Sequence, residues 1–395
     1  MSSRLYYDDS YLRRFHATAE TGADDPTLVY LDRTAFYPTS GGQPHDVGRL
    51  GDAQVIEVTE EGEDGRIAHR VDRPVASGWV PCEIDWPRRF DHMRQHTGQH
   101  LLSAVLSDRF ALPTVSFHLG TEISTIDLDV AQLKGDVARA LTEAERAANE
   151  VIAGNHPVRV SYHEGREGLR LRKPSDRDGV LRVVTIEDVD QSACGGTHVA
   201  STGEVGAVLL RKTDKIRGNL RVEFLCGERA VRQARADYDA LTAVARHFSS
   251  PLEQTPALVA SLGERQAEAE RLNRKLTLEL AAIRGRELYA ATAPNARGVR
   301  VVVRETAAAP GDDVRAEAQA FTGAGGPAVF LAMSAGEPSA VLLATSPDAP
   351  LQAALPAVGG RGGGNAALAQ GSVPNAEALA RLRQSLETQW AGGNQ

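Results

Sequence analysis

Hydrophobic and polar residues alternate over short runs through the first 88 residues of the chain. Alternation of this kind, with β-branched residues, is typical of half-buried strands. Clusters of Gly, Pro and Asp separate the runs, and we expect strands at 11–19, 27–32, 54–58, 65–71 and 80–86. Because strands this short and this close in sequence are most easily closed on themselves, the pattern predicts a small β-barrel over residues 1–88.

The spacing of hydrophobic residues changes to a helical period at about residue 89. A helix is predicted over 89–110, followed later by a second helix that ends near Ile152 and has Thr142 and Glu145 as its capping box. Further strands are predicted at 114–120, 124–129, 158–162, 181–186, 206–210 and 221–226. Because helices and strands are mixed without strict alternation, we expect residues 89–228 to form an α+β domain.

The stretch that follows is charged and has helical spacing up to about residue 290, with an interruption near 249–251. Four of its hydrophobic residues recur at every seventh position: Leu262, Ala269, Leu276 and Ile283. This pattern fits an antiparallel helical hairpin or a short coiled coil, and it fits a plain amphipathic spacer equally well. We therefore predict a helical spacer at 229–292. Residues 293–395 alternate strands with a helix and include a glycine-rich run, which predicts a small C-terminal α/β domain.

Composition bounds the class of protein. At 395 residues the chain can hold several domains, each with its own core. The longest apolar runs are too short to cross a bilayer, and three cysteines fit a reducing cytosol better than a disulfide framework. A cytoplasmic protein without a membrane partner is therefore expected. The net charge of −8 indicates no general affinity for nucleic acid, although a local basic face can still bind phosphate.

Two pairs of potential metal ligands lie far apart in the sequence. His96 and His100 fall on one face of the predicted helix, about one turn apart. Cys194 and His198 enclose Gly-Gly-Thr, and the glycines allow a tight turn that can bring both side chains together. Three imidazoles and a thiolate are a suitable ligand set for tetrahedral Zn²⁺, so we predict a zinc site at His96, His100, Cys194 and His198.

Each pair alone has an ordinary interpretation, because histidine pairs are common in cores and on surfaces and a single cysteine is usually a small buried hydrophobe. The occurrence of both pairs favours the metal site. No Glu follows His96, which excludes the helix motif of metalloproteases. Four protein ligands would make the zinc structural and three would leave a position for water, and the sequence leaves both possibilities open.

Three motifs resemble the editing domain of alanyl-tRNA synthetases and the free-standing AlaX trans-editing proteins. They are Asp-His-Met-Arg-Gln-His-Thr-Gly-Gln-His-Leu-Leu at 91–102, Ser-Ala-Cys-Gly-Gly-Thr-His at 192–198, and the segment 36–48 with its Gly-Gly-Gln. The motifs occur in the family's order within roughly the first half of the chain. The glycine-rich run 359–371 is similar to the C-terminal domain of alanyl-tRNA synthetases, which is also appended to DHH phosphoesterases.

The resemblance implies a hydrolytic site that cleaves the ester between a wrong amino acid and tRNA, at Thr34, His96, His100 and Cys194. Thr34, by its position ahead of Phe36, would contact the side chain of serine; otherwise it is an ordinary strand threonine. The resemblance also implies contacts to the acceptor end or tRNA from Gly41, Gly42, Gln43 and Arg361. Ser116 and His118 share one face of a predicted strand, and they can contact substrate only if that face meets the pocket.

The main prediction is a zinc-dependent deacylase that acts in trans on mischarged Ser-tRNA(Ala), with Gly-tRNA(Ala) as a further candidate. A complete synthetase is not expected, because the sequence leaves no room for an adenylate-forming domain before the barrel and has no P-loop. The alternative is a zinc-stabilised tRNA- or RNA-binding protein without hydrolytic activity. The C-terminal region would hold tRNA or pair two chains as a homodimer. A minority of the following basic residues is expected to bind phosphate: Arg166, Arg170, Arg172, Lys173, Arg211, Lys212, Lys215, Arg217 and Arg221.

Overall fold

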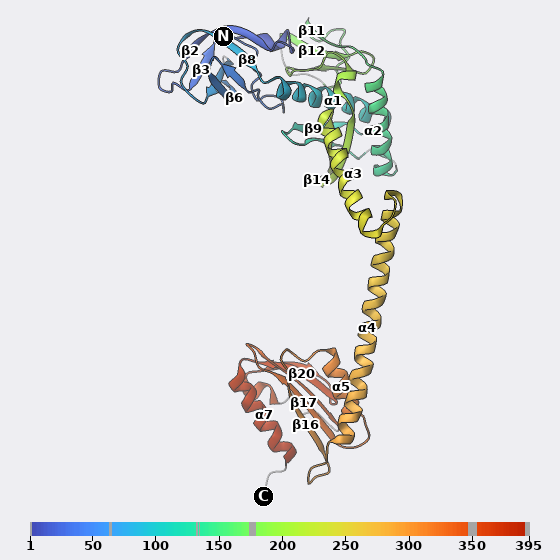
Figure 1. Ribbon diagram of the computed structural model, residues 1–395. Helices are drawn as coiled ribbons and strands as arrows, with labels where there is room; N and C mark the ends of the chain where they lie inside the picture. Colours follow the sequence, from blue (N-terminus) through green and yellow to red (C-terminus); the bar gives the residue numbers. More distant parts are fainter. Residues whose placement is uncertain are drawn as a thin grey trace. The chain divides into compact units, whose positions relative to one another are not determined.

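The computed structural model describes residues 2–62, 65–131, 133, 135–173, 179–346 and 354–391. Helices and strands are mixed along the chain, as the sequence predicts (Figure 1). Contacts within the chain divide it into two compact units, Met1–Val244 and Ala245–Gln395. The boundary between the units lies inside helix α3 (Glu228–Phe248). The finer division into four domains stays a prediction.

Six of the described strands of the first unit close into a barrel. In order around the barrel they are β2 (Arg14–Thr21), β3 (Leu28–Leu31), β7 (Arg66–Val71), β6 (Ala53–Glu61), β5 (Gly48–Leu50) and β8 (Gly78–Ile84). Strand β2 shows why they form, since Phe15, Ala17 and Ala19 are buried while the residues between them are exposed. A short parallel pair, β1 (Ser3–Arg4) and β4 (Arg33–Thr34), lies outside this closed ladder.

Helix α1 (Trp86–Phe110) is the central element of the remainder of this unit. The side chain of Asp85 caps its first turn by accepting a hydrogen bond from the backbone N–H of Arg88, and Ala111 ends it in the left-handed conformation, with φ 55°. Every residue from His92 to Leu106 except Arg94 is buried. The helix is therefore enclosed by its neighbours, and polar side chains on it need partners inside the protein.

Two sheets and a second helix surround α1. One described sheet is antiparallel, in the order β14 (Val208–Ile216), β15 (Asn219–Cys226), β10 (Ser124–Leu128) and β9 (Thr114–Leu119). The other consists of β11 (Val158–Glu164), β12 (Val180–Ile186) and β13 (Asp190–Ala193), and the sequence did not predict β13. Short 3-10 turns lie at η1 (Leu5–Tyr7) and η2 (Thr202–Val205). Met93, Leu101 and Leu106 of α1 share one core with helix α2 (Val137–Ala153) and the first sheet.

The predicted cap of α2 is wrong. The helix begins at Val137, five residues before Thr142, and its N-cap is Asp136, whose side chain accepts a hydrogen bond from the N–H of Ala138. Thr142 instead donates its hydroxyl to the carbonyl of Ala138, one turn back. Glu145 accepts a hydrogen bond from the backbone N–H of Leu210 at 2.6 Å, so its carboxylate holds strand β14. The Thr-x-x-Glu pattern therefore arises from two unrelated contacts.

The second unit is a five-stranded sheet with helices on both faces (Figure 1). In sheet order its described strands are β16 (Arg300–Glu305), β17 (Ala328–Ser334), β18 (Ser339–Ser346), β20 (Leu368–Val373) and β19 (Arg361–Gly364). Phe330 packs with α5 (Asp312–Thr322) and with Leu288 of α4 (Thr255–Ala291). Its neighbour Leu331 points the other way and packs with α7 (Ala376–Ala391). Short 3-10 turns lie at η3 (Leu252–Gln254) and η4 (Pro356–Val358).

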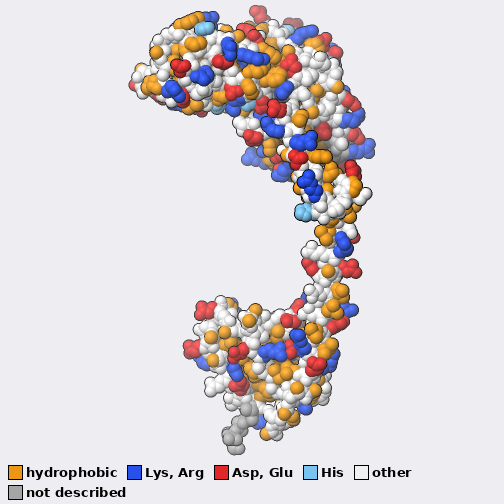
Figure 2. Space-filling model, viewed as in Figure 1, with side chains coloured by type: hydrophobic (Ala, Val, Ile, Leu, Met, Phe, Trp, Pro, Cys, Tyr) orange, Lys and Arg blue, Asp and Glu red, His pale blue; other side chains and the backbone are white. Residues whose placement is uncertain are grey.

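The interruption expected near 249–251 separates α3 from α4, as predicted. Hydrophobic side chains on α4 are well exposed, as Figure 2 shows, and Leu262, Leu272 and Leu276 are each about half accessible to solvent, at 47%, 54% and 53%. Whether these side chains pair with a second chain stays a prediction. None of the helices in the described ranges combines the length and the apolar character needed to span a membrane.

Candidate metal centre and substrate cavity

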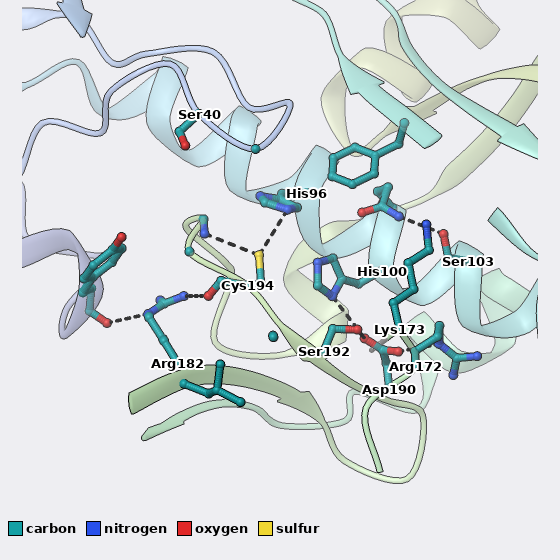
Figure 3. A pocket seen from close by; sticks show the side chains of 18 of the residues that line it. Ser40, His96, His100, Ser103, Arg172, Lys173, Arg182, Asp190, Ser192 and Cys194 are labelled. Atoms are coloured by element: carbon teal, nitrogen blue, oxygen red, sulfur yellow. Dashed lines mark hydrogen bonds and ion pairs between the residues drawn. The ribbon is translucent and has the colours of Figure 1, made fainter. Parts of the chain in front are cut away.

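The structure brings the four predicted ligands together in the first unit. The donor atoms of His96, His100, Cys194 and His198 all lie within 4.8 Å of one another. Helix α1 supplies the first two, one turn apart, and the turn after β13 supplies the others. Figure 3 shows His96, His100 and Cys194. The three histidines are buried and Cys194 is partly exposed. A cluster of three nitrogens and one sulfur at this spacing fits a tetrahedral zinc ion.

Each imidazole is fixed through its Nδ1 atom by a different partner. His96 Nδ1 lies 2.8 Å from Gln43 Oε1, His100 Nδ1 lies 3.1 Å from Asp190 Oδ2, and His198 Nδ1 lies 3.1 Å from Thr97 Oγ1. The other ring nitrogen, Nε2, lies on the side of the cluster. His96 Nε2 is 3.5 Å from Cys194 Sγ, and His198 Nε2 is 3.3 Å from the same sulfur. Histidines that bind metals are usually held in this way, with the second nitrogen bonded to an outer partner. The residues present therefore fit a zinc ion.

Cys194 lies in surroundings that favour its thiolate. Burial by itself raises the pKa of this thiol, but charge interactions with His96 and His198 outweigh it and hold the pKa well below its usual range. The backbone N–H of Gly196 points at the sulfur at 3.4 Å. A side chain at Gly196 would meet the His96 ring, since a Cβ there would lie 2.2 Å from its Cε1. Glycine at this position therefore allows the ligand turn to approach α1.

The Gly-Gly-Gln segment supports the cluster from the barrel side. Gly41 and Gly42 have positive φ angles of 54° and 81°, and a Cβ on Gly42 would lie 2.9 Å from the ring of Phe117. The side chain of Gln43 is fully buried and donates to Thr197 Oγ1 at 2.9 Å, besides contacting His96. The amide that was expected to bind the acceptor end is thus engaged inside the protein. The contact observed with His96 orients the ring of that metal-ligand candidate.

A buried ion pair attaches this segment to the metal helix. Asp46 and Arg89 are both fully buried, with Arg89 Nε 2.9 Å from each oxygen of the Asp46 carboxylate. Arg89 also donates to the carbonyl of Ser10, and Asp46 accepts from the N–H of Tyr37. Because a buried charge without its partner is strongly destabilising, the pair keeps the loop that carries Gln43 in register with α1.

A cavity of about 850 Å³ opens beside the cluster. Three of the four donors, His96, His100 and Cys194, lie in its wall (Figure 3). The 3-10 turn η1 and the segment after β4 contribute an aromatic end made of Tyr6, Tyr7 and Tyr37, and α1 with β9 contributes Gln99, Ser103 and Thr114. Its volume falls in the range of pockets for small ligands, so the cavity can hold an amino acid joined to a nucleoside.

Three other predicted site residues do not line this cavity. Thr34 is fully buried, and its hydroxyl lies 2.8 Å from His69 Nε2, so its contact with serine stays a prediction that this position does not support. On β9, Phe117 lines the cavity whereas Ser116 and His118 are exposed. Ser116 donates to Asp127 at 2.8 Å. Ser116 and His118 therefore do not meet the cavity, whereas Thr114 at the start of β9 does.

Arg361 belongs to the second unit. It lies on β19, an edge strand of the sheet, and lines a separate cavity of about 790 Å³ together with Arg315 and Gln370. Arg315 Nη2 donates to Gln370 Oε1 across this cavity wall at 2.5 Å. The RNA contact expected of Arg361 stays a prediction.

Several of the candidate phosphate contacts are paired within the protein. Arg172 bridges Asp108 and Asp190, with 2.7 Å and 2.6 Å between the closest atoms. Arg211, Lys212 and Arg221 form ion pairs with Asp237, Asp214 and Asp127, respectively. Which of the nine candidates bind RNA stays a prediction.

Sequence reasoning missed residues that the cavity uses. Arg182 interrupts the apolar strand β12, which was a usable signal, and its guanidinium donates to the carbonyls of Cys194 and Tyr7 at 2.6 Å and 3.1 Å. Gln99 shares the helix face of the two histidines, which was also visible in the spacing. Asp190 gave no signal, because its role depends on a pairing between β12 and β13 that the sequence does not reveal.

Comparison with known proteins places these features in a family. Residues 181–222, which include Cys194 and His198, match the family described as "Threonyl and Alanyl tRNA synthetase second additional domain". The chain is 38% identical over 245 residues to the alanyl-tRNA editing protein AlaX-M of Methanosarcina acetivorans, which covers 57% of this chain and 98% of that relative. It is 36% identical over 245 residues to AlaX-L of Pyrococcus horikoshii, covering 58% of this chain and 59% of the relative.

A longer match extends to a synthetase. The chain is 35% identical over 291 residues to an alanine–tRNA ligase of Pyrococcus furiosus, covering 70% of this chain and 31% of the ligase. The chain thus spans less than a third of the length of that ligase. Nearly the whole of AlaX-M, in contrast, aligns with the chain. The chain belongs to the family of alanyl-tRNA editing proteins.

Proposed function

We propose that this protein is a zinc-dependent aminoacyl-tRNA deacylase that acts in trans and hydrolyses mischarged Ser-tRNA(Ala), with Gly-tRNA(Ala) as a further substrate. One observation carries the proposal: three donors of a fixed His/Cys cluster lie in the wall of a cavity large enough for an aminoacyl nucleoside. The match to nearly the full length of a relative named as an alanyl-tRNA editing protein supports action as a free-standing enzyme.

Zinc held at the cluster of His96, His100, Cys194 and His198, with one ligand position open to the cavity, would polarise the ester carbonyl and lower the pKa of a water molecule. The protein keeps the three rings in place through Gln43, Asp190 and Thr97. An aminoacyl ester is an activated bond, so orientation of the substrate and stabilisation of the developing negative charge are the main requirements.

The rest of the cavity suits the two parts of the substrate. Tyr6, Tyr7 and Tyr37 form an aromatic end that can pack against the terminal adenosine. Gly41 lines the cavity without a side chain, so the backbone can approach the ribose closely. The proposed partner is tRNA(Ala), which the names of the relatives support, and the proposed location is the cytoplasm. The second unit would hold the tRNA or pair two chains.

The test is release of serine from Ser-tRNA(Ala) by protein whose zinc content has been measured. Release should exceed the chemical rate and should need no ATP, because no amino acid is activated. A Cys194→Ala, His198→Ala double variant is the control and should lose both bound zinc and activity. If zinc-loaded protein binds tRNA(Ala) but releases no serine, the RNA-binding alternative is correct.

A further inference from the structure

One face of helix α1 carries other polar side chains into the cavity wall besides the metal-ligand candidates. His96, Gln99, His100 and Ser103 stand at helical positions i, i+3, i+4 and i+7, and all four line the cavity. Figure 3 labels His96, His100 and Ser103. Gln99 is next to His100 in the chain and is only 5% exposed. A polar amide in this position faces the space beside the metal cluster, where the reacting ester must lie if the proposed function holds.

The amide of Gln99 is only half satisfied. Its Nε2 atom donates to Ser103 Oγ at 2.8 Å, and Ser103 Oγ lies 2.7 Å from Thr114 Oγ1. Its Oε1 atom is buried and has no hydrogen-bond partner within the described part of the chain. Buried amide atoms are nearly always paired, so an orphaned atom in a cavity wall indicates a partner on the ligand.

The hydroxyl groups of Ser103 and Thr114, which lie behind the amide, restrict the chemistry of that partner. Hydroxyls can donate or accept, so Ser103 can support the Gln99 amide in either orientation, leaving Oε1 or Nε2 free. A ligand hydroxyl can satisfy both orientations, because it also donates and accepts. An ammonium group only donates, so it can satisfy only the orientation that leaves Oε1 free. A methyl group or a hydrogen atom can satisfy neither orientation.

We propose that Gln99 determines specificity by hydrogen-bonding the side-chain hydroxyl of a seryl ester. This inference rests on the proposed function and names the group that separates serine from its competitors. Glycine and alanine leave the amide atom without a partner in the occupied cavity. A site built to bind a hydroxyl rejects substrates that lack it much more strongly than an apolar pocket rejects a missing methyl.

The test compares Gln99→Met, which keeps the length of the side chain without its polar atoms, with wild-type protein. Gln54→Met is the matched control, because that glutamine is exposed on β6 and does not line the cavity. In single-turnover assays the ratio of kcat/KM for Ser-tRNA(Ala) over Gly-tRNA(Ala) should fall about 10- to 100-fold in Gln99→Met. Zinc content and glycine release should stay close to wild type. Equal losses for both substrates would assign Gln99 to the shared ammonium group and overturn the inference.

A binding assay separates this inference from the proposed function. Seryl- and glycyl-adenosine analogues, with an amide in place of the ester, report the preference without hydrolysis. Wild-type protein should bind the seryl analogue about tenfold or more tightly than the glycyl analogue, and Gln99→Met should bind both alike. Such a result in protein that cannot hydrolyse Ser-tRNA(Ala) would refute the deacylase and keep the specificity residue. An active deacylase whose preference is unchanged in Gln99→Met would refute the role of Gln99 in specificity and keep the deacylase.

Discussion

At the scale of single residues, the metal ligands were predictable and their partners were not. The spacing of His96 and His100 fixes them on one helix face whatever surrounds the helix. The partners of the ligand rings, such as Gln43 and Asp190, come from segments distant in sequence, and only the tertiary structure brings them to the rings. Gln43 was expected to face the substrate. Its side chain is fully buried and contacts His96 and Thr197, so its contact with the acceptor end stays a prediction.

The contact between Gln43 and His96 leads to a prediction about the metal. Gln43→Ala should weaken zinc binding by about 10- to 100-fold, because the His96 ring loses the group that orients it. Competition with a chelator measures the affinity. Gln54→Ala is a suitable control, since Gln54 is an exposed glutamine on β6 of the same barrel. Wild-type zinc affinity in a folded Gln43→Ala protein would show that the contact does not orient the ligand.

At the scale of elements, long periodic segments were predicted well and short or polar ones were not. The interior of α1 is buried on nearly all sides, yet its helical spacing was strong enough to be recognised. Strand β13 is Asp-Gln-Ser-Ala, and nothing in four polar or small residues indicates a strand until β12 pairs with it. The start of α2 was misplaced because Thr142 and Glu145 have the spacing of a capping box while each serves a different contact.

The two candidate caps of α2 can be compared directly. Asp136→Ala should lower the free energy of unfolding of the first unit by about 1 kcal/mol, because the N–H of Ala138 loses its acceptor. Thr142→Ala should change it by less than about 0.5 kcal/mol, since its hydroxyl only bonds back to a carbonyl of the helix. Urea denaturation followed by circular dichroism measures both. A larger loss for Thr142→Ala would restore the capping box.

At the scale of the whole molecule, the proposed chemistry is confined to one unit. All four donors and the cavity beside them lie in Met1–Val244. The second unit contributes the glycine-rich edge strand β19 with Arg361 and has no grouped His, Cys, Asp or Glu ligands among its described residues. The sequence indicated this division, because every predicted ligand precedes the helical segment. It could not indicate what β19 binds, since glycine-rich strands have few side chains to interpret.

This division predicts the behaviour of a truncated chain. Protein that ends after α3, at Phe248, should keep its zinc and reach a saturated rate within about threefold of the full chain. Its KM for tRNA should rise, because binding that is equal in ground and transition states is lost with the second unit. Steady-state kinetics on Ser-tRNA(Ala), with zinc content as the check on folding, measure both effects. A folded, zinc-loaded truncation whose saturated rate falls by orders of magnitude would place part of the catalysis in the second unit.

The central claim, that a metal at the His/Cys cluster drives hydrolysis of mischarged tRNA, is tested most directly by titrating zinc into metal-free protein while serine release from Ser-tRNA(Ala) is followed. The account predicts that the rate rises in proportion to added zinc and stops rising at about one zinc per chain, the stoichiometry of a single tetrahedral site. Protein without zinc that hydrolyses at the full rate, or protein with one zinc per chain that hydrolyses at the uncatalysed rate, would contradict it.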